Sequence, residues 1–469
     1  MKKPDPSGEK TGLDAIHFRY LGTPDFRDGT AFIWPEHITA IGEVLEDGLV
    51  CSALRVGYSA GIEGGLFKPA DFQVPGRRVI RTYVNDTGKR RETARKGHYL
   101  FLELLVNTGP DANEHRELFG NYKYSPSGGP WSMELPLVVP LRQINTVFRA
   151  DGRKIAPFNR VNDDQYIEIV DDMIRSVYKD PQTGVTIAYN LFVPPGYETG
   201  TPEQDPLPLV FFLHGAGESG YDNRSPVSAY RQALEYLRPE VRTEDPCFLM
   251  IPQCPVTLER DRGLFEEYGW YTYIKDPEGD SPVTWPSKSL RAAINALVDA
   301  VVPAYRIDRR RIYAAGHSMG GGGVLAALVE RPEVFAAAVS FSSAAVFSDS
   351  MLEKIKNKPL FFTLAEGDEW DIIRNNMPRM MEQLERLGVR LCRAAGDKAW
   401  DGALRGEAAK KQAEEVIARA EAMGASIIYA EFIRDSIVPA AHLSHRASFE
   451  NPGIRRWLFE KHLDPTSGF

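Results

Sequence analysis

The sequence is poor in cysteine, and none of its four cysteines forms a C-x-x-C pair, so nothing indicates a zinc ribbon or a thioredoxin-type site. Cys247 and Cys254 flank the apolar stretch Phe248–Ile251. If that stretch is a β-strand, it holds the two thiols far beyond the reach of a disulfide bond. The cysteine pattern therefore predicts a reducing compartment.

Long hydrophobic runs and an excess of positive charge are also missing. The longest apolar run, Leu207–Leu213, is far shorter than the ~18–20 residues that span a bilayer, so we expect no membrane partner. Lys and Arg number 56 against 64 Asp and Glu, which gives a net charge of −8. We therefore expect no nucleic-acid partner, and we expect the basic stretch Lys89–Lys96 to be a solvated hairpin tip.

An N-terminal leader is not visible either. Residues Met1–Pro6 carry two lysines with no apolar segment behind them, so the sequence predicts no signal peptide. We expect a cytoplasmic protein, or a secreted one if a signal sequence has been removed from the chain.

The composition, with 43% hydrophobic and 26% charged residues, is that of a globular protein. Residues 1–36 are rich in Pro, Gly and charge and predict an N-terminal extension. Residues 37–163 hold short apolar or alternating runs separated by turn sequences, which predict a small antiparallel β-sandwich. The runs are His37–Leu45, Leu49–Tyr58, Arg78–Val84, Tyr99–Val106 and Leu135–Phe148.

Residues 164–469 have a different pattern, in which short apolar strands alternate with amphipathic helices. The predicted strands are Leu209–Leu213, Phe248–Ile251, Ile312–Ala315, Ala336–Ser340, Leu360–Leu364 and Ile427–Phe432. The predicted helices are Lys288–Val301, Gly321–Glu330, Pro378–Leu387 and Gly406–Met423. Such alternation predicts an open, mostly parallel α/β sheet covered by helices.

The clearest motif is G-x-S-x-G at Gly316–Gly320, placed between a predicted strand and a predicted helix. This context is that of a nucleophile elbow, where a tight turn presents the serine and the helix N-terminus favours developing negative charge. The alternative is a glycine-rich turn used only for close packing, which the run Gly320–Gly323 makes reasonable. The context favours Ser318 as a nucleophile.

A second motif, H-G-x-G, begins at His214 directly after the strand Leu209–Leu213. In a serine acyl-transfer site such a loop supplies one backbone N–H to the oxyanion, and the residue after the nucleophile supplies the other. The expected oxyanion-hole donors are Ala216 and Met319. We expect His214 to order the loop without transferring protons.

The general base is sought among the nine histidines, because in this arrangement it follows the serine in the chain. Only His442, His445 and His462 do, and His462 is expected on the surface of a terminal helix. His442 and His445 lie together in a loop after the strand Ile427–Phe432. Their H-x-x-H spacing also suits a metal, but no third ligand accompanies it, so we expect no metal site.

The acid is expected after the strand Leu360–Leu364, where several carboxylates lie close together. They are Glu366, Asp368, Glu369 and Asp371. Spacing alone does not separate them, and all but one are expected to be solvated loop charges.

These motifs give the region from Asp164 to the C-terminus a resemblance to α/β-hydrolase esterases near the poly(hydroxybutyrate) depolymerases and feruloyl esterases. The matching segments are Leu213–Glu218, Asp222–Asn223, Pro246–Cys247, Pro252–Pro255, Asp308, Arg311–Tyr313 and Gly316–Gly321. Ile38–Ile41 and Gly97–Leu100 resemble the immunoglobulin-like domain that one bacterial esterase subgroup carries at its N-terminus. The resemblance implies an α/β-hydrolase domain preceded by an immunoglobulin-like β-sandwich.

The resemblance also implies roles for single residues. It implies Ser318 as the nucleophile. The family's acid follows a Gly or Ala by three positions, as Asp368 follows Ala365, so Asp368 is preferred over Asp371. The family's G-H-x-S-W loop corresponds to Ala441–His445, which selects His442 as the base. No metal or organic cofactor is implied.

Three features depart from the family pattern. Ala441 replaces the glycine before the base, and Glu369 with Trp370 replaces the Pro and Val after the acid. A charged helix, about 401–423, is inserted before the last strand and is expected to form a lid or a wall of the substrate pocket. Four residues are expected at that pocket: His214, His317, Trp270 and Trp370. For Trp270 and nearby aromatics, the alternative is that they anchor the loop.

The resemblance implies a serine carboxylic-ester hydrolase that acts on short-chain or aryl esters, free or polymer-linked, through a Ser-His-Asp triad. The same triad could serve a peptidase or an acyltransferase. In a third alternative the hydrolase domain is inert and the protein is a binding or scaffold protein. The sandwich is expected to be an oligomerisation surface, giving a homo-oligomer, or a wall of the pocket.

Overall fold

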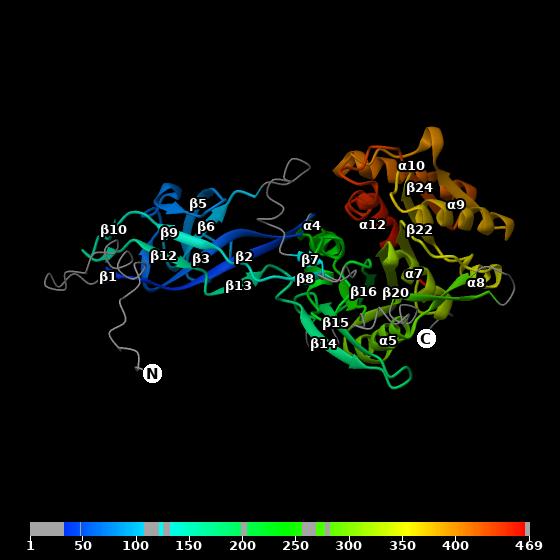
Figure 1. Cartoon of the computed structure of the whole chain (residues 1–469), viewed down its shortest axis with the longest axis horizontal. Helices are drawn as coiled ribbons and strands as arrows, with labels where there is room; N and C mark the ends of the chain where they lie inside the picture. Colours follow the sequence, from blue (N-terminus) through cyan, green and yellow to red (C-terminus); the bar gives the residue numbers. More distant parts are fainter. Residues whose placement is uncertain are drawn as a thin grey trace, which may run out of the picture.

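A computed structural model describes residues 32–46, 48–106, 122–124, 132–197, 204–255, 269–276 and 282–464. The described chain forms two bodies that lie side by side along its long axis, a β-sandwich and a larger α/β domain (Figure 1). Most of the predicted extension, residues 1–31, lies outside the described residues. Phe32–Ile33 form strand β1 and Pro35 begins β2, so the last residues of the predicted extension belong to the sandwich.

The sandwich contains a five-stranded sheet in the order β13-β2-β3-β6-β5 and two three-stranded sheets, β12-β9-β4 and β1-β11-β10. The five strands are β2 (Pro35–Leu45), β3 (Gly48–Glu63), β5 (Val79–Asn85), β6 (Lys96–Leu104) and β13 (Asp164–Ile167). The others are β4 (Phe72–Gln73), β9 (Pro140–Gln143), β10 (Val147–Phe148), β11 (Lys154–Ile155) and β12 (Phe158–Val161). The predicted antiparallel sandwich is confirmed for most of these pairs, and β13 with β2 and β1 with β11 are parallel.

Two sequence predictions in the sandwich are wrong in detail. Leu135–Phe148 is not one strand, because β9 begins only at Pro140 and a separate β10 follows; prolines lack the backbone N–H that a continuous ladder needs. The basic stretch is not wholly solvated. The guanidinium of Arg90 is buried and pairs with Glu43, Glu103 and Glu168 at 3.1, 2.6 and 2.8 Å.

The crossover between the two domains is marked by strand pairing. β13 pairs with β2 and so belongs to the sandwich, whereas β14 (Ile174–Lys179) is the first strand of the α/β sheet. By this pairing the crossover lies between Ile167 and Ile174, a few residues beyond the predicted boundary at 163/164.

The α/β domain is built on a nine-stranded sheet in the order β14-β15-β17-β16-β20-β21-β22-β24-β23. Its further strands are β15 (Thr186–Phe192), β16 (Leu207–Leu213), β17 (Phe248–Gln253), β20 (Ile307–His317), β21 (Ala337–Phe341), β22 (Leu360–Ala365), β23 (Leu391–Ala394) and β24 (Ile427–Phe432). β15 runs antiparallel to β14 and β17, and the remaining pairs are parallel. The predicted mostly parallel sheet is confirmed.

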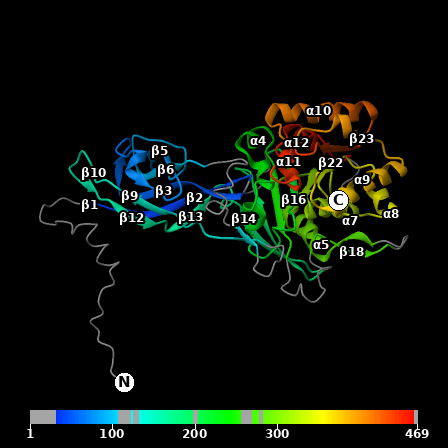
Figure 2. The ribbon, with the colours of Figure 1, turned by 45° about the horizontal axis from the view of Figure 1, so that its top comes forward.

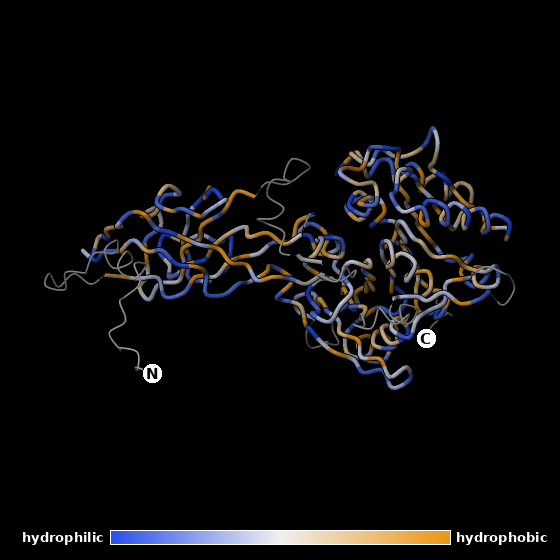
Figure 3. Tube along the Cα trace, viewed as in Figure 1, coloured by the Kyte–Doolittle hydropathy of each residue, from blue (hydrophilic) through white to orange (hydrophobic). Residues whose placement is uncertain are grey.

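Helices cover both faces of this sheet (Figure 2). One face packs against α5 (Lys288–Asn295), α7 (Met319–Glu330), α8 (Asp349–Ile355) and α9 (Asp371–Arg386). The other packs against α10 (Gly406–Met423), α11 (His445–Phe449) and α12 (Pro452–Phe459). In β16 the side chains alternate between these faces, Val210 and Phe212 on one and Phe211 on the other, each essentially fully buried. Hydrophobic segments follow the strands of both domains in Figure 3.

Some elements differ from the prediction. α9 begins seven residues before Pro378, which lies inside the helix although a proline usually marks a helix start. The helix predicted at Lys288–Val301 is α-helical only to Asn295 and continues as a π-helix over Ala296–Val301. Strands β14, β15 and β23 and the hairpin of β18 (Tyr271–Lys275) with β19 (Pro282–Pro286) were not predicted. The inserted helix, α10, packs against α12, β23 and β24; its role as a lid or wall stays a prediction.

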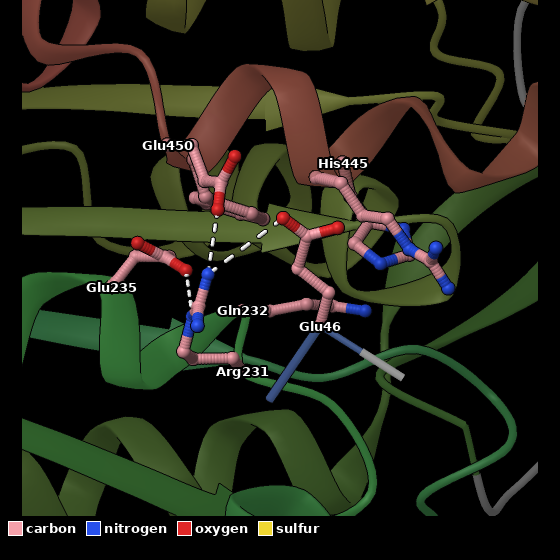
Figure 4. A pocket seen from close by; sticks show the side chains of 8 residues that line it. Glu46, Arg231, Gln232, Glu235, His445 and Glu450 are labelled. Carbon is pink, nitrogen blue, oxygen red and sulfur yellow. Dashed lines mark hydrogen bonds and ion pairs between the residues drawn. The ribbon is translucent and has the colours of Figure 1, made fainter. Parts of the chain in front are cut away.

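The two domains meet through partly buried ion pairs. Arg224 pairs with Glu134 and Asp171 at 2.9 and 2.6 Å. The turn between β2 and β3 brings Glu46 to 3.8 Å from Arg231, which also binds Glu450 at 2.6 Å (Figure 4). Because both ends of these pairs are partly shielded from water, they help to fix the sandwich on the α/β domain.

The four cysteines are buried and form no disulfide. Among the described residues, no helix is both long and apolar enough to cross a membrane.

Candidate active site

Ser318 lies at the tip of a sharp turn between β20 and α7. Its backbone has φ 58° and ψ −121°, a strained conformation for a residue with a side chain. A Cβ atom at Gly316 would lie 2.5 Å from the carbonyl oxygen of Gly320, and one at Gly320 would overlap the carbonyl oxygen of Leu213. The two motif glycines are therefore required by the backbone of the elbow.

The remaining glycines of the run Gly320–Gly323 serve packing. A Cβ atom at Gly323 would lie 2.7 Å from the Cβ of Trp270, and one at Gly322 would overlap the ring of Tyr271. The hairpin β18–β19 thus lies directly on the first turn of α7. The glycine run therefore serves both the geometry of the elbow and close packing, which the sequence had offered as the alternative.

A continuous hydrogen-bonded chain joins Ser318, His442 and Asp368. His442 Nε2 lies 3.1 Å from Ser318 Oγ, and His442 Nδ1 lies 2.9 Å from Asp368 Oδ2. Ser318 and His442 are half-buried, whereas the Asp368 side chain is wholly buried. This arrangement suits proton transfer from the serine to an imidazole whose positive form a buried carboxylate stabilises.

The structure separates Asp368 from Asp371, which spacing alone did not. Asp368 follows β22, and its Oδ1 accepts a hydrogen bond from the backbone N–H of Trp370 at 3.0 Å. Asp371 instead begins α9, with its side chain 79% exposed and paired with Arg374. Only Asp368 reaches the imidazole.

Glu369 is an exposed loop charge, as expected, but its carboxylate also has a structural role that the sequence did not predict. Its carboxylate accepts hydrogen bonds from the backbone N–H groups of Ala441 and His442, at 2.7 and 2.8 Å. It therefore holds the loop that carries His442 against the loop that carries Asp368. No sequence signal separated it from its neighbours, because its partners are backbone groups about seventy residues away.

The H-G-x-G loop lies beside the elbow and is ordered by His214. The buried His214 ring donates from Nδ1 to the carbonyl of Gly215 at 2.6 Å and accepts at Nε2 from the N–H of Cys254 at 2.9 Å. Burial lowers the pKa of His214 to about 4, so the ring is neutral. The backbone N–H groups of Ala216 and Met319 donate to no other described residue. They remain free to bind an oxyanion.

His317 and His445 pack behind the base. His317 donates from Nε2 to the carbonyl of His442 at 2.9 Å, and its ring centroid lies 4.6 and 4.5 Å from those of His442 and His445. Burial lowers the pKa values of His317 and His445 well below the usual range. Both ring nitrogens of His442 are engaged by Ser318 and Asp368, so the H-x-x-H pair is not arranged to chelate a metal.

The four residues expected at the substrate pocket divide into two groups. His214, His317 and Trp270 lie in the interior, with Trp270 wholly buried and donating from Nε1 to the carbonyl of His214 at 3.1 Å. Trp270 thus has the loop-anchoring role that was the alternative. Trp370 is 59% exposed, and its ring centroid lies 6.2 Å from that of His442. Among the four, Trp370 is the one that faces solvent at the site.

Two family models match the chain. Residues 37–156 match the esterase immunoglobulin-like N-terminal domain, and residues 181–425 match the family described as "Putative esterase". A search of curated proteins finds no match.

Several solved structures align with parts of this chain. A structure described as a thermostable esterase has 27% sequence identity and a TM-score of 0.70, covering 91% of this chain and 100% of its own. A ferulic acid esterase has 14% identity and a TM-score of 0.35, covering 61% of this chain and 98% of its own. FphF, a fluorophosphonate-binding serine hydrolase of Staphylococcus aureus, has 13% identity and a TM-score of 0.35, covering 59% of this chain and 97% of its own.

Proposed function

The chain belongs to the esterase family whose model matches residues 181–425, and from this and the geometry of the site we propose that it is a serine carboxylic-ester hydrolase with Ser318, His442 and Asp368 as its catalytic triad. The observation that carries the proposal is the hydrogen-bonded chain from Ser318 Oγ through His442 to the buried Asp368. The site is completed by the two glycines of the elbow and by the backbone N–H groups of Ala216 and Met319.

The reaction begins with His442 Nε2 taking the proton of Ser318 Oγ while the oxygen attacks the ester carbonyl carbon. The backbone N–H groups of Ala216 and Met319 donate hydrogen bonds to the resulting oxyanion. When this tetrahedral species collapses, the alcohol leaves with the proton from His442 and the acyl group stays on Ser318. His442 then activates a water molecule, which releases the acid and restores the serine.

Asp368 supports these reaction steps through its negative charge and by orienting the imidazole of His442. Its two oxygens are held by His442 and by the Trp370 backbone, so it fixes which imidazole nitrogen carries the proton. Glu369 fixes the backbone of the loop that carries His442 by accepting hydrogen bonds from its N–H groups. The base is thus positioned before any substrate arrives, which lowers the reorganisation needed during the reaction.

Covalent labelling tests the proposal directly. A fluorophosphonate is expected to modify the intact protein at one residue, located at Ser318 by peptide mass spectrometry, because the triad activates only that hydroxyl. Hydrolysis of paired ester, amide and thioester substrates then separates an esterase from a peptidase or an acyltransferase. Labelling of the peptide at any other serine, or none at all, is incompatible with the proposal.

We further propose that aryl esters are favoured through Trp370, whose exposed ring lies beside His442. Replacing Trp370 with Ala is expected to lower kcat/KM for 1-naphthyl acetate about fivefold relative to ethyl acetate, since one aromatic contact contributes ~1 kcal/mol. The matched control is Ile372→Ala, a neighbouring exposed apolar side chain at the start of α9, which should leave this ratio unchanged. Equal ratios in wild type and Trp370→Ala would contradict the aryl preference.

A further inference from the structure

Glu218 is a buried carboxyl group beside the nucleophile that the triad mechanism does not use. It ends the tight turn that starts at Gly215, where its backbone N–H donates to the Gly215 carbonyl at 3.4 Å. Its side chain folds back over this turn, which also contains the oxyanion donor Ala216. A Cβ atom built on Gly215 would lie 3.2 Å from Glu218 Oε2 and 3.8 Å from the Cβ of Ser318. The carboxyl oxygen is therefore no more than about 7 Å from the Cβ of the nucleophile.

This carboxyl group lacks the side-chain partners that usually accompany a buried acid, and the hydrogen bond it accepts comes from its own backbone N–H. The residue is 6% exposed, and its carboxyl makes no ion pair or hydrogen bond with another residue in the part of the chain that the structure describes. Burial raises the pKa of Glu218 to about 7. At pH 6 the group is mostly a neutral acid with an O–H to donate, and above pH 8 it is mostly a carboxylate.

The groups packed around this turn leave Glu218 with little compensation when it ionises. His214 on the same loop and His317 from the elbow are buried and neutral. Asp222, at the end of the loop, accepts hydrogen bonds from Gln253 and Ser225 and adds negative charge. His442 is the one group whose charge lowers the pKa of Glu218. An ionised Glu218 would therefore make the electrostatic potential near the nucleophile more negative, which disfavours an oxyanion there, so it is the neutral form that suits this position.

We propose that Glu218, as a neutral carboxylic acid, is an additional hydrogen-bond donor at the oxyanion hole, acting with the backbone donors of Ala216 and Met319. This inference rests on the proposed function. The carboxyl O–H donates to the oxyanion without losing its proton, so no bond breaks and no further reactant is needed. Ionisation of the same group removes the donor and places a second negative charge beside the oxyanion. The acid thereby sets the alkaline limit of the reaction.

The test is the pH dependence of kcat/KM for p-nitrophenyl butyrate, measured between pH 5 and pH 9.5. The wild type should lose activity as the pH rises through about 7, where Glu218 ionises. Glu218→Gln keeps an N–H donor that cannot ionise, so its activity at pH 6 should stay within about threefold of wild type, and the alkaline decline should disappear. Glu218→Met keeps the volume without a donor and should lower activity at pH 6 by about 10- to 100-fold.

Two comparisons keep the outcome clear. Glu366→Gln removes an exposed carboxylate, paired with Arg434, from the loop that carries the acid, and should leave the pH profile unchanged. Thermal unfolding of each variant distinguishes a structural effect from a catalytic one. A structural effect would change the unfolding temperature without moving the alkaline limb of the pH profile. An unchanged alkaline limb in Glu218→Gln, or full activity of Glu218→Met at pH 6, overturns the inference. If the wild type neither hydrolyses esters nor reacts with a fluorophosphonate, the proposed function fails instead.

Discussion

Replacing Ser318 with Ala is expected to lower kcat for p-nitrophenyl butyrate by about 10⁴- to 10⁶-fold, because the variant lacks the atom that attacks the ester. The oxyanion donors and the histidine loop remain in place, so a small residual rate above that of water is expected. The measurement is steady-state hydrolysis, with thermal unfolding to show that the variant is folded. Alanine accepts the same backbone strain that serine does at φ 58°, so the fold should persist.

A matched control is available on the neighbouring strand. Ser342 directly follows β21, is buried and also has a positive φ of 46°, but its hydroxyl bonds Ser444 and not the base. Ser342→Ala should therefore keep activity within about tenfold of wild type, since it removes one ordinary hydrogen bond. Comparable losses in the two variants would mean that Ser318 has no special role.

The second large effect is expected for Asp368→Asn, which should lower kcat about 10⁴-fold at neutral pH. The amide cannot stabilise the positive form of His442, and it favours the wrong imidazole tautomer. Asp371→Asn is the control, because the Asp371 side chain is largely exposed and pairs only with Arg374 nearby. Its activity should change by less than about twofold.

The comparison of these two aspartates also decides the assignment. A large loss in Asp371→Asn with a small one in Asp368→Asn would contradict the geometry described above. We expect that no change of pH restores the activity of Asp368→Asn, because the variant lacks the fixed negative charge that orients and stabilises His442. The readout is therefore kcat across pH 6 to 9 rather than a single value.

Much of the fold follows from local sequence. The alternation of apolar strands and amphipathic helices identifies the α/β sheet, and β24 and α10 begin and end where the pattern predicts. Two of the strands that were missed, β14 and β23, are the edge strands of the nine-stranded sheet. β14 has no buried residue, so its sequence carries only a weak hydrophobic signal.

The nucleophile elbow is also a local property, since a strand, two glycines, a serine and a helix are consecutive in the chain. The sequence by itself therefore determines Ser318, the glycine positions and the loop at His214. Each depends on backbone geometry within a few residues, where steric limits leave few alternatives.

Only the tertiary structure decides the rest of the site, because the remaining contacts join residues far apart in the chain. It shows that Asp368 and not Asp371 reaches His442, that Glu369 holds the His442 backbone, and that Trp270 is an anchor while Trp370 is exposed. It likewise turns Glu218 from an unremarked loop residue into a buried acid near the nucleophile. Several carboxylates in one loop are equivalent in sequence; distance and burial, which chain packing sets, give each a different chemistry.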